Sequence, residues 1–208
     1  ERIWQEIHKA LCTRSPQVFL QVLRDCGALE HLLPEIANLF GVPQPEFFHP
    51  EIDTGIHTLL VVEQAAKLTE DPAIRFAAMV HDLGKAVTPK ALWPAHKGHE
   101  GLGAELIDAM SQRLRIPNEY RELAILTSQH HTRCHRAIQH TAEERFTTLE
   151  LTDAIRRPRR FAQFLLACEA DARGRTGLEE RAYPQHAILS HDLNTALQLD
   201  VRSVIAGQ

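Results

Sequence analysis

The adjacent residues His81 and Asp82, in the stretch MVHDLGKA, place an imidazole beside a carboxylate at the end of a predicted helix. Imidazole nitrogen suits borderline transition metals, and carboxylate oxygen suits Mg²⁺ and Mn²⁺ as well. The pair therefore offers two ligands for a divalent metal ion from one helix end. Such a pair is also typical of a solvated helix end, so partners elsewhere in the chain decide between the two interpretations.

Two further residues are candidates for those partners. His57 begins an earlier predicted helix, and Asp171 continues the apolar stripe of a later one. A carboxylate on a core face is costly unless a cation or hydrogen-bond donors meet it. A bound metal ion would be such a cation, and the alternative is a structural ion pair with Arg173 or Arg175.

The chain is rich in histidine, with 13 among 208 residues. His99, His130 and His131 are candidates for a second metal ion or for substrate contacts, and His130 or His131 could instead protonate a leaving oxygen. Lys85, just beyond the pair, could reach an anionic oxygen of a substrate, or it could be a solvated cation at a helix end. The predicted catalytic residues are His81, Asp82, Lys85, His130 and His131.

Apolar residues recur at helical spacing in nearly every segment, and alternating strand patterns are almost absent, which predicts an all-α fold. Asp is a preferred N-cap residue and Pro a preferred first helical residue, so Asp71 and Pro72 predict the start of a helix. Gly84 is predicted to end that helix after His81 and Asp82. Predicted helices cover residues 2–12, 16–24, 28–40, 57–68, 72–82, 100–115 and 117–130, and others start at a Thr141–Glu144 capping box, at Pro158 and near residue 186.

The segment GVPQPEFFHPEIDTG, residues 41–55, is rich in Pro and Gly and indicates a connection between subdomains. It predicts a boundary near residue 45, between a short helical segment (1–45) and a larger domain with a helical tail (46–208). No run approaches the roughly 18 apolar residues that span a bilayer, and the start of the chain does not resemble a signal peptide. These features predict a cytoplasmic protein, whose four scattered cysteines are reduced.

The net charge of −4 and the pI near 6.4 argue against a protein that binds nucleic acid over its whole surface. A local basic patch is nevertheless present, formed by Arg156, Arg157, Arg159, Arg160, Arg173 and Arg175. These arginines are candidates for contacts with RNA phosphates, which position a nucleic acid without reading its sequence. The alternative is a solvated helix junction, because charge runs are usually exposed.

The order of the candidate ligands, a His, then an adjacent His and Asp, then a distant Asp, resembles the HD family of metal-dependent phosphohydrolases over about residues 50–175. The resemblance implies an all-helical domain with a divalent metal ion as its cofactor. The implied ligands are His57, His81, Asp82 and Asp171. The additional histidines of binuclear family members resemble His99, His130 and His131. The number of ions stays open, and so does the choice among Mg²⁺, Mn²⁺, Ni²⁺ and Co²⁺.

Three further stretches, ERIWQEI, LRDCGALEHLLPEI and HKGHEGLGAELI, resemble the C-terminal half of the bacterial tRNA nucleotidyltransferases that add CCA. This resemblance implies that residues 1–45 contact tRNA, that residues 46–208 form the HD domain, and that a nucleotidyltransferase head precedes them in a longer protein. The signature of that head, a Gly-Ser followed by an Asp-x-Asp pair, does not occur in this sequence. A monomer or weak homo-oligomer without membrane attachment is expected.

The implied activity is hydrolysis of 2′,3′-cyclic phosphates and of phosphomonoesters on nucleotides or tRNA 3′ ends, in the repair of damaged tRNA. Free nucleotides stay open as substrates, whereas the absence of a GYP tripeptide after the HD pair disfavours cyclic dinucleotides. A second alternative is a helical RNA-binding module with a noncatalytic metal site, which the complete ligand set disfavours. A structural zinc site is also disfavoured, because such sites prefer four Cys or His ligands.

Overall fold

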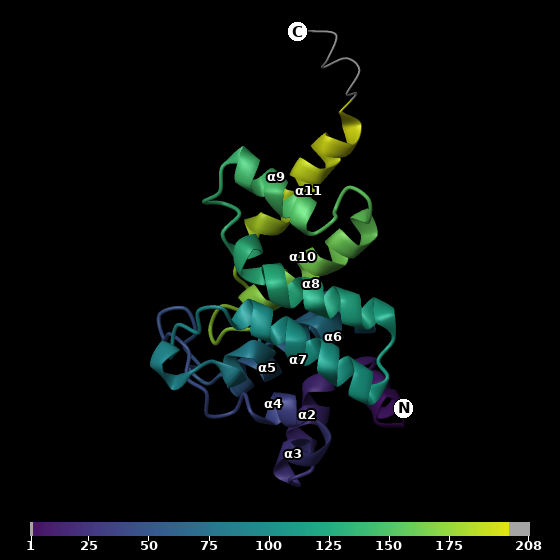
Figure 1. Ribbon diagram of the computed structural model, residues 1–208, viewed down its shortest axis with the longest axis vertical. Coiled ribbons are helices and arrows are strands. Elements are labelled where there is room, and N and C mark those ends of the chain that lie inside the picture. Colours follow the sequence, from purple (N-terminus) through teal and green to yellow (C-terminus); the bar gives the residue numbers. More distant parts are fainter. Residues whose placement is uncertain (1, 200–208) are drawn as a thin grey trace.

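The computed structural model describes residues 2–199, and every named element in that range is a helix (Figure 1). The one extended pairing within it is an isolated bridge between Pro43 and Asp53. The all-α prediction is confirmed. The helices are α1 (Arg2–Leu11), α2 (Pro16–Asp25), α3 (Leu29–Leu32), α4 (Pro34–Ala37), α5 (Thr54–Leu68), α6 (Pro72–Val80), the 3₁₀ helices η1 (Leu83–Val87) and η2 (Lys90–Leu92), α7 (His99–Leu114), α8 (Asn118–His135), α9 (Ala142–Leu151), α10 (Pro158–Arg173) and α11 (Pro184–Gln198).

Helix α6 is the centre of the fold, because its sequence PAIRFAAMV is apolar on nearly every side. Every residue from Ala73 to Val80 is buried, as expected for a helix that is hydrophobic all round. Helices α5, α8 and α10 pack against α6, and α7 covers α8 and η1. Neighbouring helices therefore surround the C-terminal end of α6, which His81 and Asp82 follow directly.

Arg75 is the charged exception on α6, and its side chain is buried. Its guanidinium donates to the carbonyl oxygens of Leu11 (2.6 Å) and Thr13 (2.8 Å) at the end of α1, and to those of Ala66 (3.1 Å) and Thr69 (2.8 Å) at the end of α5. The partial negative charge of both helix C-termini favours a cation at this position. One side chain thus joins the N-terminal helices to the rest of the fold.

Helices α1 to α4 share the hydrophobic core of the larger part of the chain. Trp4 on α1 makes edge-to-face contacts with Phe76 (ring centroids 5.5 Å apart) and Tyr120 (4.9 Å). Leu20 on α2 is buried in the same cluster. The predicted boundary near residue 45 falls in the loop between α4 and α5, and it stays a prediction, since the core is continuous across it.

Most predicted helix ends are close to those of the structure. The Asp71 cap and the capping box of Thr141 and Glu144 are present as predicted. Helix α6 ends earlier than predicted, at Val80, and α8 continues beyond its predicted end at residue 130 to His135. The part of the predicted C-terminal tail after residue 199 lies outside the described residues.

Gly84 does not end α6 as predicted, but lies within η1, where α7 passes close to the backbone. A Cβ atom there would collide with the carbonyl oxygen of His99 and would lie 2.6 Å from the amide nitrogen of Gly103. We therefore expect Gly84→Ala to lower the free energy of unfolding by about 1–3 kcal/mol, because two backbones must separate. Chemical denaturation measures this loss. Gly101→Ala, whose methyl group meets open space, is the control, and equal losses in both variants would contradict the interpretation.

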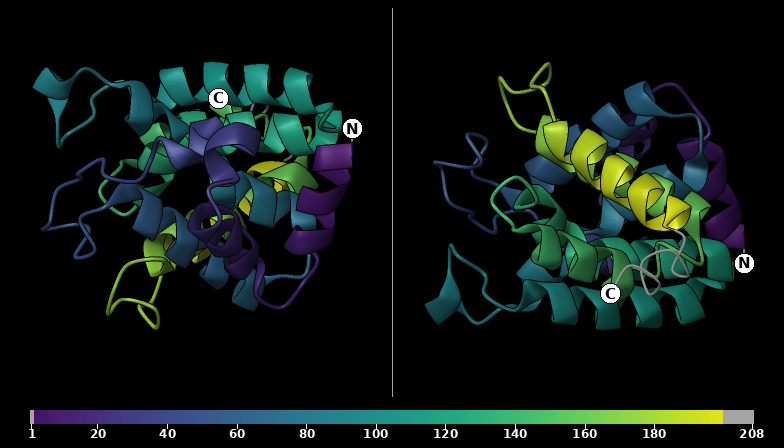
Figure 2. Two further views of the ribbon diagram at one scale, coloured as in Figure 1. Left: turned by 90° about the horizontal axis from the view of Figure 1, so that it is seen from below. Right: turned by 90° about the horizontal axis from the view of Figure 1, so that it is seen from above.

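Three loops project from one side of the molecule, opposite the N-terminus, in the left-hand view of Figure 2. They are residues 38–53 between α4 and α5, residues 88–98 around η2, and residues 174–183 between α10 and α11. Among the described residues, no helix combines the length and the apolar character that a membrane span requires.

Candidate metal centre

The four residues that the sequence predicts as ligands lie together in the structure, although they come from three helices. His57 is in the first turn of α5, His81 and Asp82 directly follow α6, and Asp171 is near the end of α10. His57 Nε2 lies 3.1 Å from Asp171 Oδ1 and 3.9 Å from Asp82 Oδ2, and His81 Nε2 lies 3.6 Å from Asp171 Oδ2. All four side chains are buried.

The orientation of the histidine rings is fixed by backbone carbonyl groups. A carbonyl oxygen only accepts hydrogen bonds, so each ring nitrogen that faces one carries the proton. The Nδ1–H groups donate as follows: His57 to Gly174 (2.9 Å), His81 to Ala78 (2.8 Å), His99 to His96 (2.9 Å) and His131 to Ser128 (3.0 Å). When these rings are neutral, each Nε2 therefore has a free lone pair directed at the cluster, which is the usual arrangement of histidine metal ligands.

Two atoms of the adjacent pair are buried without a hydrogen-bond partner among the described residues: His81 Nε2 and Asp82 Oδ1. His81 Nε2 is 3.1 Å from Asp82 Oδ2, but not in hydrogen-bonding geometry. An unsatisfied buried acceptor costs about 1–3 kcal/mol, and more when it is charged. A divalent cation would satisfy both atoms, so the residues present fit the metal ion that the sequence implies.

His99 and His131 extend the cluster on the other side of Asp82. Their Nε2 atoms lie 3.3 and 3.6 Å from Asp82 Oδ1, and 3.4 Å from each other. His130, predicted with them, is half-buried and makes no hydrogen bond or ion pair with the cluster among the described residues. Consecutive helical residues point about 100° apart, so His130 and His131 on α8 do not face the same site.

His135 also belongs to the cluster, although it is not among the site residues predicted from the sequence. Its Nε2 lies 2.6 Å from Asp171 Oδ2, and its Nδ1 lies 2.8 Å from the hydroxyl group of Tyr183. The signal for His135 is its position four residues after His131, because residues with that spacing share one helix face. Because α8 was predicted to end at residue 130, the sequence did not predict that His131 and His135 share a helix face.

Lys85 is buried rather than solvated, in contrast to the alternative considered for it. Its Nζ donates to Asp82 Oδ2 (2.7 Å) and to Gln44 Oε1 (2.8 Å). The second bond ties the loop between α4 and α5 to the cluster. Asp82, which accepts the first of these bonds, is a candidate metal ligand. Lys85 therefore lies where it can contact an anion bound beside Asp82.

The charges of the cluster stabilise one another. Burial alone would raise the pKa of Asp82, but the charges of His81 and Lys85 outweigh it and hold that pKa well below its usual range. Burial likewise opposes ionisation of Asp171, whose pKa is lowered chiefly by His135 and His81. Burial lowers the pKa of His131. Both aspartates are thus carboxylates, and His131 is neutral, as metal ligation requires.

Glu51 supports the cluster from the loop before α5. Its Oε1 lies 2.9 Å from His57 Nδ1 and 3.1 Å from His49 Nδ1. A carboxylate behind a ligating histidine orients the ring and raises its basicity. No helical spacing relates Glu51 to His57, so this role could not be predicted from the sequence.

We expect Glu51→Gln to weaken divalent-metal affinity about 10- to 100-fold, because the amide keeps the shape but loses the charge behind His57. Calorimetric titration of the metal-free protein with Mn²⁺ measures the change. Glu179→Gln, on the neighbouring loop 174–183, is the matched control. Unchanged affinity in Glu51→Gln would show that Glu51 does not position this ligand.

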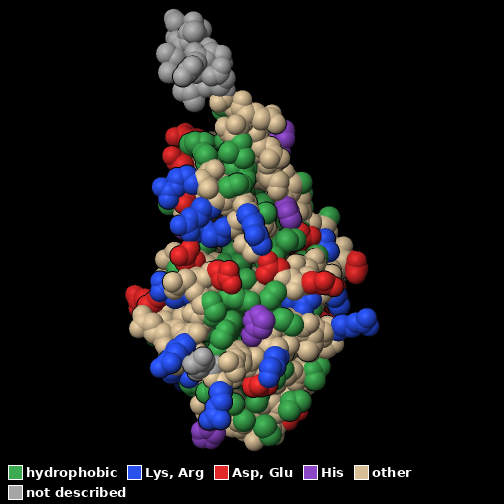
Figure 3. All heavy atoms as spheres, turned by 90° about the vertical axis from the view of Figure 1, so that its right-hand side faces the viewer, with side chains coloured by type: hydrophobic (Ala, Val, Ile, Leu, Met, Phe, Trp, Pro, Cys, Tyr) green, Lys and Arg blue, Asp and Glu red, His purple; other side chains and the backbone are tan. Residues whose placement is uncertain are grey.

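The six arginines of the predicted RNA patch are mostly engaged within the chain. Arg156, Arg157 and Arg160 form ion pairs with Asp153, and the last two also with Glu122. On the face seen in Figure 3, basic side chains accordingly lie beside acidic ones.

The remaining arginines differ from one another. Arg173 pairs with Glu169 (2.6 Å), and Arg175 lies 3.7 Å from Asp171 Oδ1. Arg159 is exposed and has no ion pair in the described part of the chain. At 1.5 Å of rise per residue, Arg159 on α10 lies roughly 18 Å from Asp171. Arg159 is therefore remote from the cluster, whereas Arg175 lies against it. The role of these arginines in RNA binding stays a prediction.

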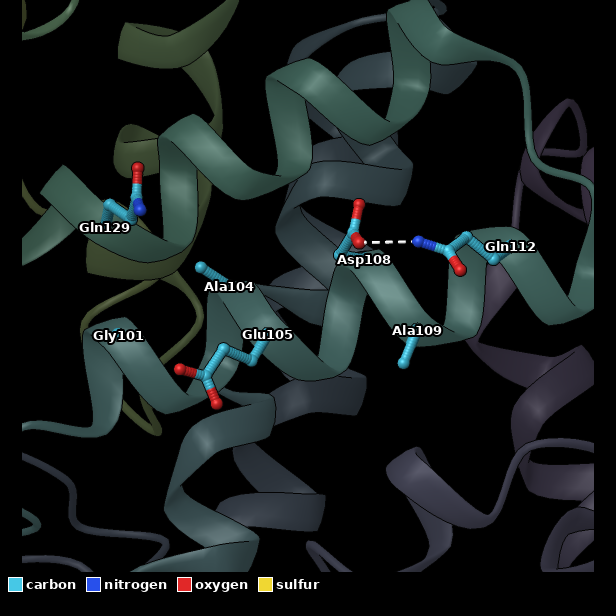
Figure 4. Close-up of a pocket in the computed structure, with 7 residues that line it drawn as sticks. All are labelled: Gly101, Ala104, Glu105, Asp108, Ala109, Gln112 and Gln129. Carbon is cyan, nitrogen blue, oxygen red and sulfur yellow. Dashed lines mark hydrogen bonds between the residues drawn. The ribbon is translucent and has the colours of Figure 1, made fainter.

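A shallow surface pocket lies elsewhere, on the outer face of α7 and α8 (Figure 4). Its lining includes Glu105, Asp108 and Gln129, and Gln112 donates to Asp108 across 2.7 Å. It contains no histidine and none of the cluster residues. The chemistry-bearing side chains are thus in the buried cluster and not in this pocket.

Comparison with known families agrees with the geometry of the cluster. Residues 54–163 match the HD domain family. Residues 1–40 match a family described as "Probable RNA and SrmB- binding site of polymerase A".

Proteins named Multifunctional CCA protein are similar to nearly the whole chain. That of Psychromonas ingrahamii is 55% identical over 205 residues, which are 99% of this chain and 50% of that protein. Those of Vibrio cholerae and Teredinibacter turnerae are 54% and 50% identical over 206 residues, 99% of this chain and 51% and 50% of those proteins. The chain spans about half the length of these curated relatives. Both resemblances seen in the sequence are confirmed.

Proposed function

The chain belongs to the HD domain family of metal-dependent hydrolases, and we propose that it hydrolyses 2′,3′-cyclic phosphates and phosphomonoesters of nucleotides or tRNA 3′ ends. The observation that supports this most is the buried cluster itself. Its imidazole and carboxylate groups converge with His81 Nε2 and Asp82 Oδ1 left unsatisfied. A purely structural cluster would be expected to satisfy those atoms within the chain.

We assign a first divalent ion to His57, His81, Asp82 and Asp171. When bound, the cation would polarise a phosphoryl oxygen and lower the pKa of a water molecule. His99 and His131 then lie on the far side of Asp82, where they would hold a second ion or face the substrate. Binding by these histidines requires them to be neutral.

Two side chains of this site would act on the substrate directly. Lys85 would hold a nonbridging phosphate oxygen by charge. Burial opposes protonation of His99, but the Asp82 carboxylate 3.3 Å away outweighs it and raises the pKa of His99. In a site with one ion, His99 is therefore suited to protonate the leaving 2′ or 3′ oxygen. His99 thus takes the role that the sequence analysis gave to His130 or His131.

The RNA part of the proposal is supported by the matched families. Residues 1–40 match a family described by RNA binding, and the relatives' names refer to CCA. We propose that residues 1–45 contact tRNA, that the HD domain covers residues 46–208, and that a nucleotidyltransferase head precedes them in the longer protein. The arginines around the start of α10 would then hold RNA away from the reacting phosphate.

Two alternatives remain candidates for the same cluster. A hydrolase of free nucleotides would use the same chemistry without the RNA contacts. A tRNA-binding module with a noncatalytic metal site would bind the ion and turn over no ester.

Turnover assays separate these functions. The protein is incubated with 2′,3′-cyclic nucleotides, with 2′- and 3′-nucleotides, and with tRNA ending in a cyclic phosphate, each with Mg²⁺, Mn²⁺, Ni²⁺ or Co²⁺. The proposal predicts hydrolysis of cyclic and monoester substrates and a higher kcat/KM for tRNA. Hydrolysis of free nucleotides alone would favour the first alternative, and no turnover with any of the four metals would contradict the hydrolase function.

A further inference from the structure

The loop between α4 and α5 exposes two adjacent aromatic side chains. Phe47 is 87% exposed and Phe48 is 56% exposed, and their rings pack edge to face with centroids 5.0 Å apart. Phenylalanine is a residue type that folding usually buries. The two rings contact each other, yet most of the surface of Phe47 is exposed to solvent.

This aromatic pair is anchored beside the metal centre. Phe48 directly precedes His49, whose ring centroid is 4.7 Å from that of His57. Earlier in the loop, Gln44 accepts a hydrogen bond from Lys85. The loop is thus held to the cluster on both sides of the two phenylalanines, through Gln44 and through His49.

A second loop adds positive charge to the same side of the molecule (Figure 2). His96 Nε2 lies 2.7 Å from the carbonyl oxygen of Pro43, so residues 88–98 are tied to the base of the aromatic loop. Lys90 and Lys97 on this second loop are exposed, and the part of the chain that the structure describes gives neither an ion pair. Lys90 lies over the ring of Trp93, 5.8 Å from its centroid.

Exposed aromatic faces beside unpaired lysines suit a single-stranded nucleic acid better than an apolar partner. Bases stack on aromatic rings whatever their sequence, while cations meet the phosphates. The exposed acid of the aromatic loop, Glu46, would repel a phosphate, so the phosphate contacts belong to the second loop. An apolar protein partner would not account for the lysines.

We propose that Phe47 and Phe48 form a stacking platform for the terminal bases of a single-stranded RNA 3′ end, whose backbone Lys90 and Lys97 contact while its phosphate enters the metal centre. This inference rests on the proposed function and names the part of the substrate that the site recognises. It makes Phe47 and Phe48 substrate-positioning residues without a part in the chemical step.

The test compares two short oligoribonucleotides that end in an uncleavable 3′-phosphonate, one with its terminal base and one with that base removed. Affinities are measured by fluorescence anisotropy with Mg²⁺ present. The wild type is expected to bind the complete oligonucleotide about tenfold more tightly than the abasic one. The double variant Phe47→Ala and Phe48→Ala is expected to bind both equally.

Further variants exclude a general apolar effect. Replacing both phenylalanines by Tyr should keep the discrimination, whereas replacing both by Leu should lose it. Phe146→Ala, an exposed phenylalanine on α9, should behave as the wild type. Equal affinity of the wild type for both oligonucleotides, or discrimination that survives in the Ala variant, would overturn the inference. A Leu variant equal to the wild type would also overturn it, because the base would then be held by apolar contact and not by stacking.

Hydrolysis is measured separately, on the same oligonucleotides ending in a 2′,3′-cyclic phosphate. Turnover of both by the wild type, with no binding discrimination, would refute the stacking platform and leave the hydrolase intact. Binding discrimination without turnover would support the platform and refute the proposed function. Circular dichroism and thermal denaturation verify that each variant is folded.

Discussion

Asp82→Ala is expected to abolish tight divalent-metal binding and to lower kcat/KM for 2′,3′-cyclic nucleotides by about a thousandfold or more, because the metal ion supplies several kcal/mol of transition-state stabilisation. Asp82 lies at the centre of the cluster. Its two oxygens are within 4 Å of Lys85 and of four histidine rings: His57, His81, His99 and His131. Loss of Asp82 therefore affects the ligands proposed for the first ion and the histidines proposed for a second ion together.

The effect should be chemical rather than a consequence of unfolding. Asp82→Ala removes the carboxylate that the cationic groups face, so the stability of the metal-free variant must be measured beside its activity. Asp108→Ala is the matched control, since Asp108 lines the surface pocket on α7 and lies nine residues after His99, about 14 Å along the helix. Activity retained in Asp82→Ala and lost in Asp108→Ala would place the reaction in that pocket and contradict the assigned site.

Arg75→Met is expected to lower the free energy of unfolding by about 3–5 kcal/mol, the largest stability effect that we predict. The methionine can fill much of the same volume, but four backbone carbonyl groups at the ends of α1 and α5 lose their donor. Urea denaturation at constant ionic strength measures the loss. A loss below about 1 kcal/mol would show that water replaces the guanidinium at these carbonyls.

Arg113→Met is the control for this prediction. Arg113 forms a bidentate pair with Glu35 (2.7 and 2.9 Å), but its side chain is 40% exposed. Exposed pairs contribute about 0–1 kcal/mol, so the two arginines should differ clearly. Similar losses in both variants would mean that burial does not determine the effect of Arg75.

The sequence allowed the ligand set to be predicted because its pattern is local and chemically distinctive. The adjacent pair His81 and Asp82 follows a helix that apolar residues identify, and Asp171 is conspicuous as a carboxylate on an apolar stripe. Helix periodicity likewise predicted the all-α fold and most helix starts. The role of each ligand as such stays a prediction until metal binding is measured.

Other features depend on contacts between distant segments, which no spacing reveals. The burial of Arg75 depends on partners at two helix ends elsewhere in the chain. Glu51 reaches His57 from a loop, and His135 joins the cluster only because α8 continues beyond its predicted end. Gly84 was read as a helix stop, whereas its missing side chain makes room for α7.

The central claim is that the buried cluster is a metal centre that hydrolyses phosphate esters. Stepwise reconstitution tests it most directly: metal is removed with a chelator, Mn²⁺ or Ni²⁺ is titrated back, and bound metal and hydrolysis of 2′,3′-cyclic AMP are followed in the same samples. We predict no hydrolysis without metal and a rate that rises in proportion to bound metal until the site is saturated. Hydrolysis that persists after metal removal, or saturation with metal that produces no hydrolysis, would contradict the claim.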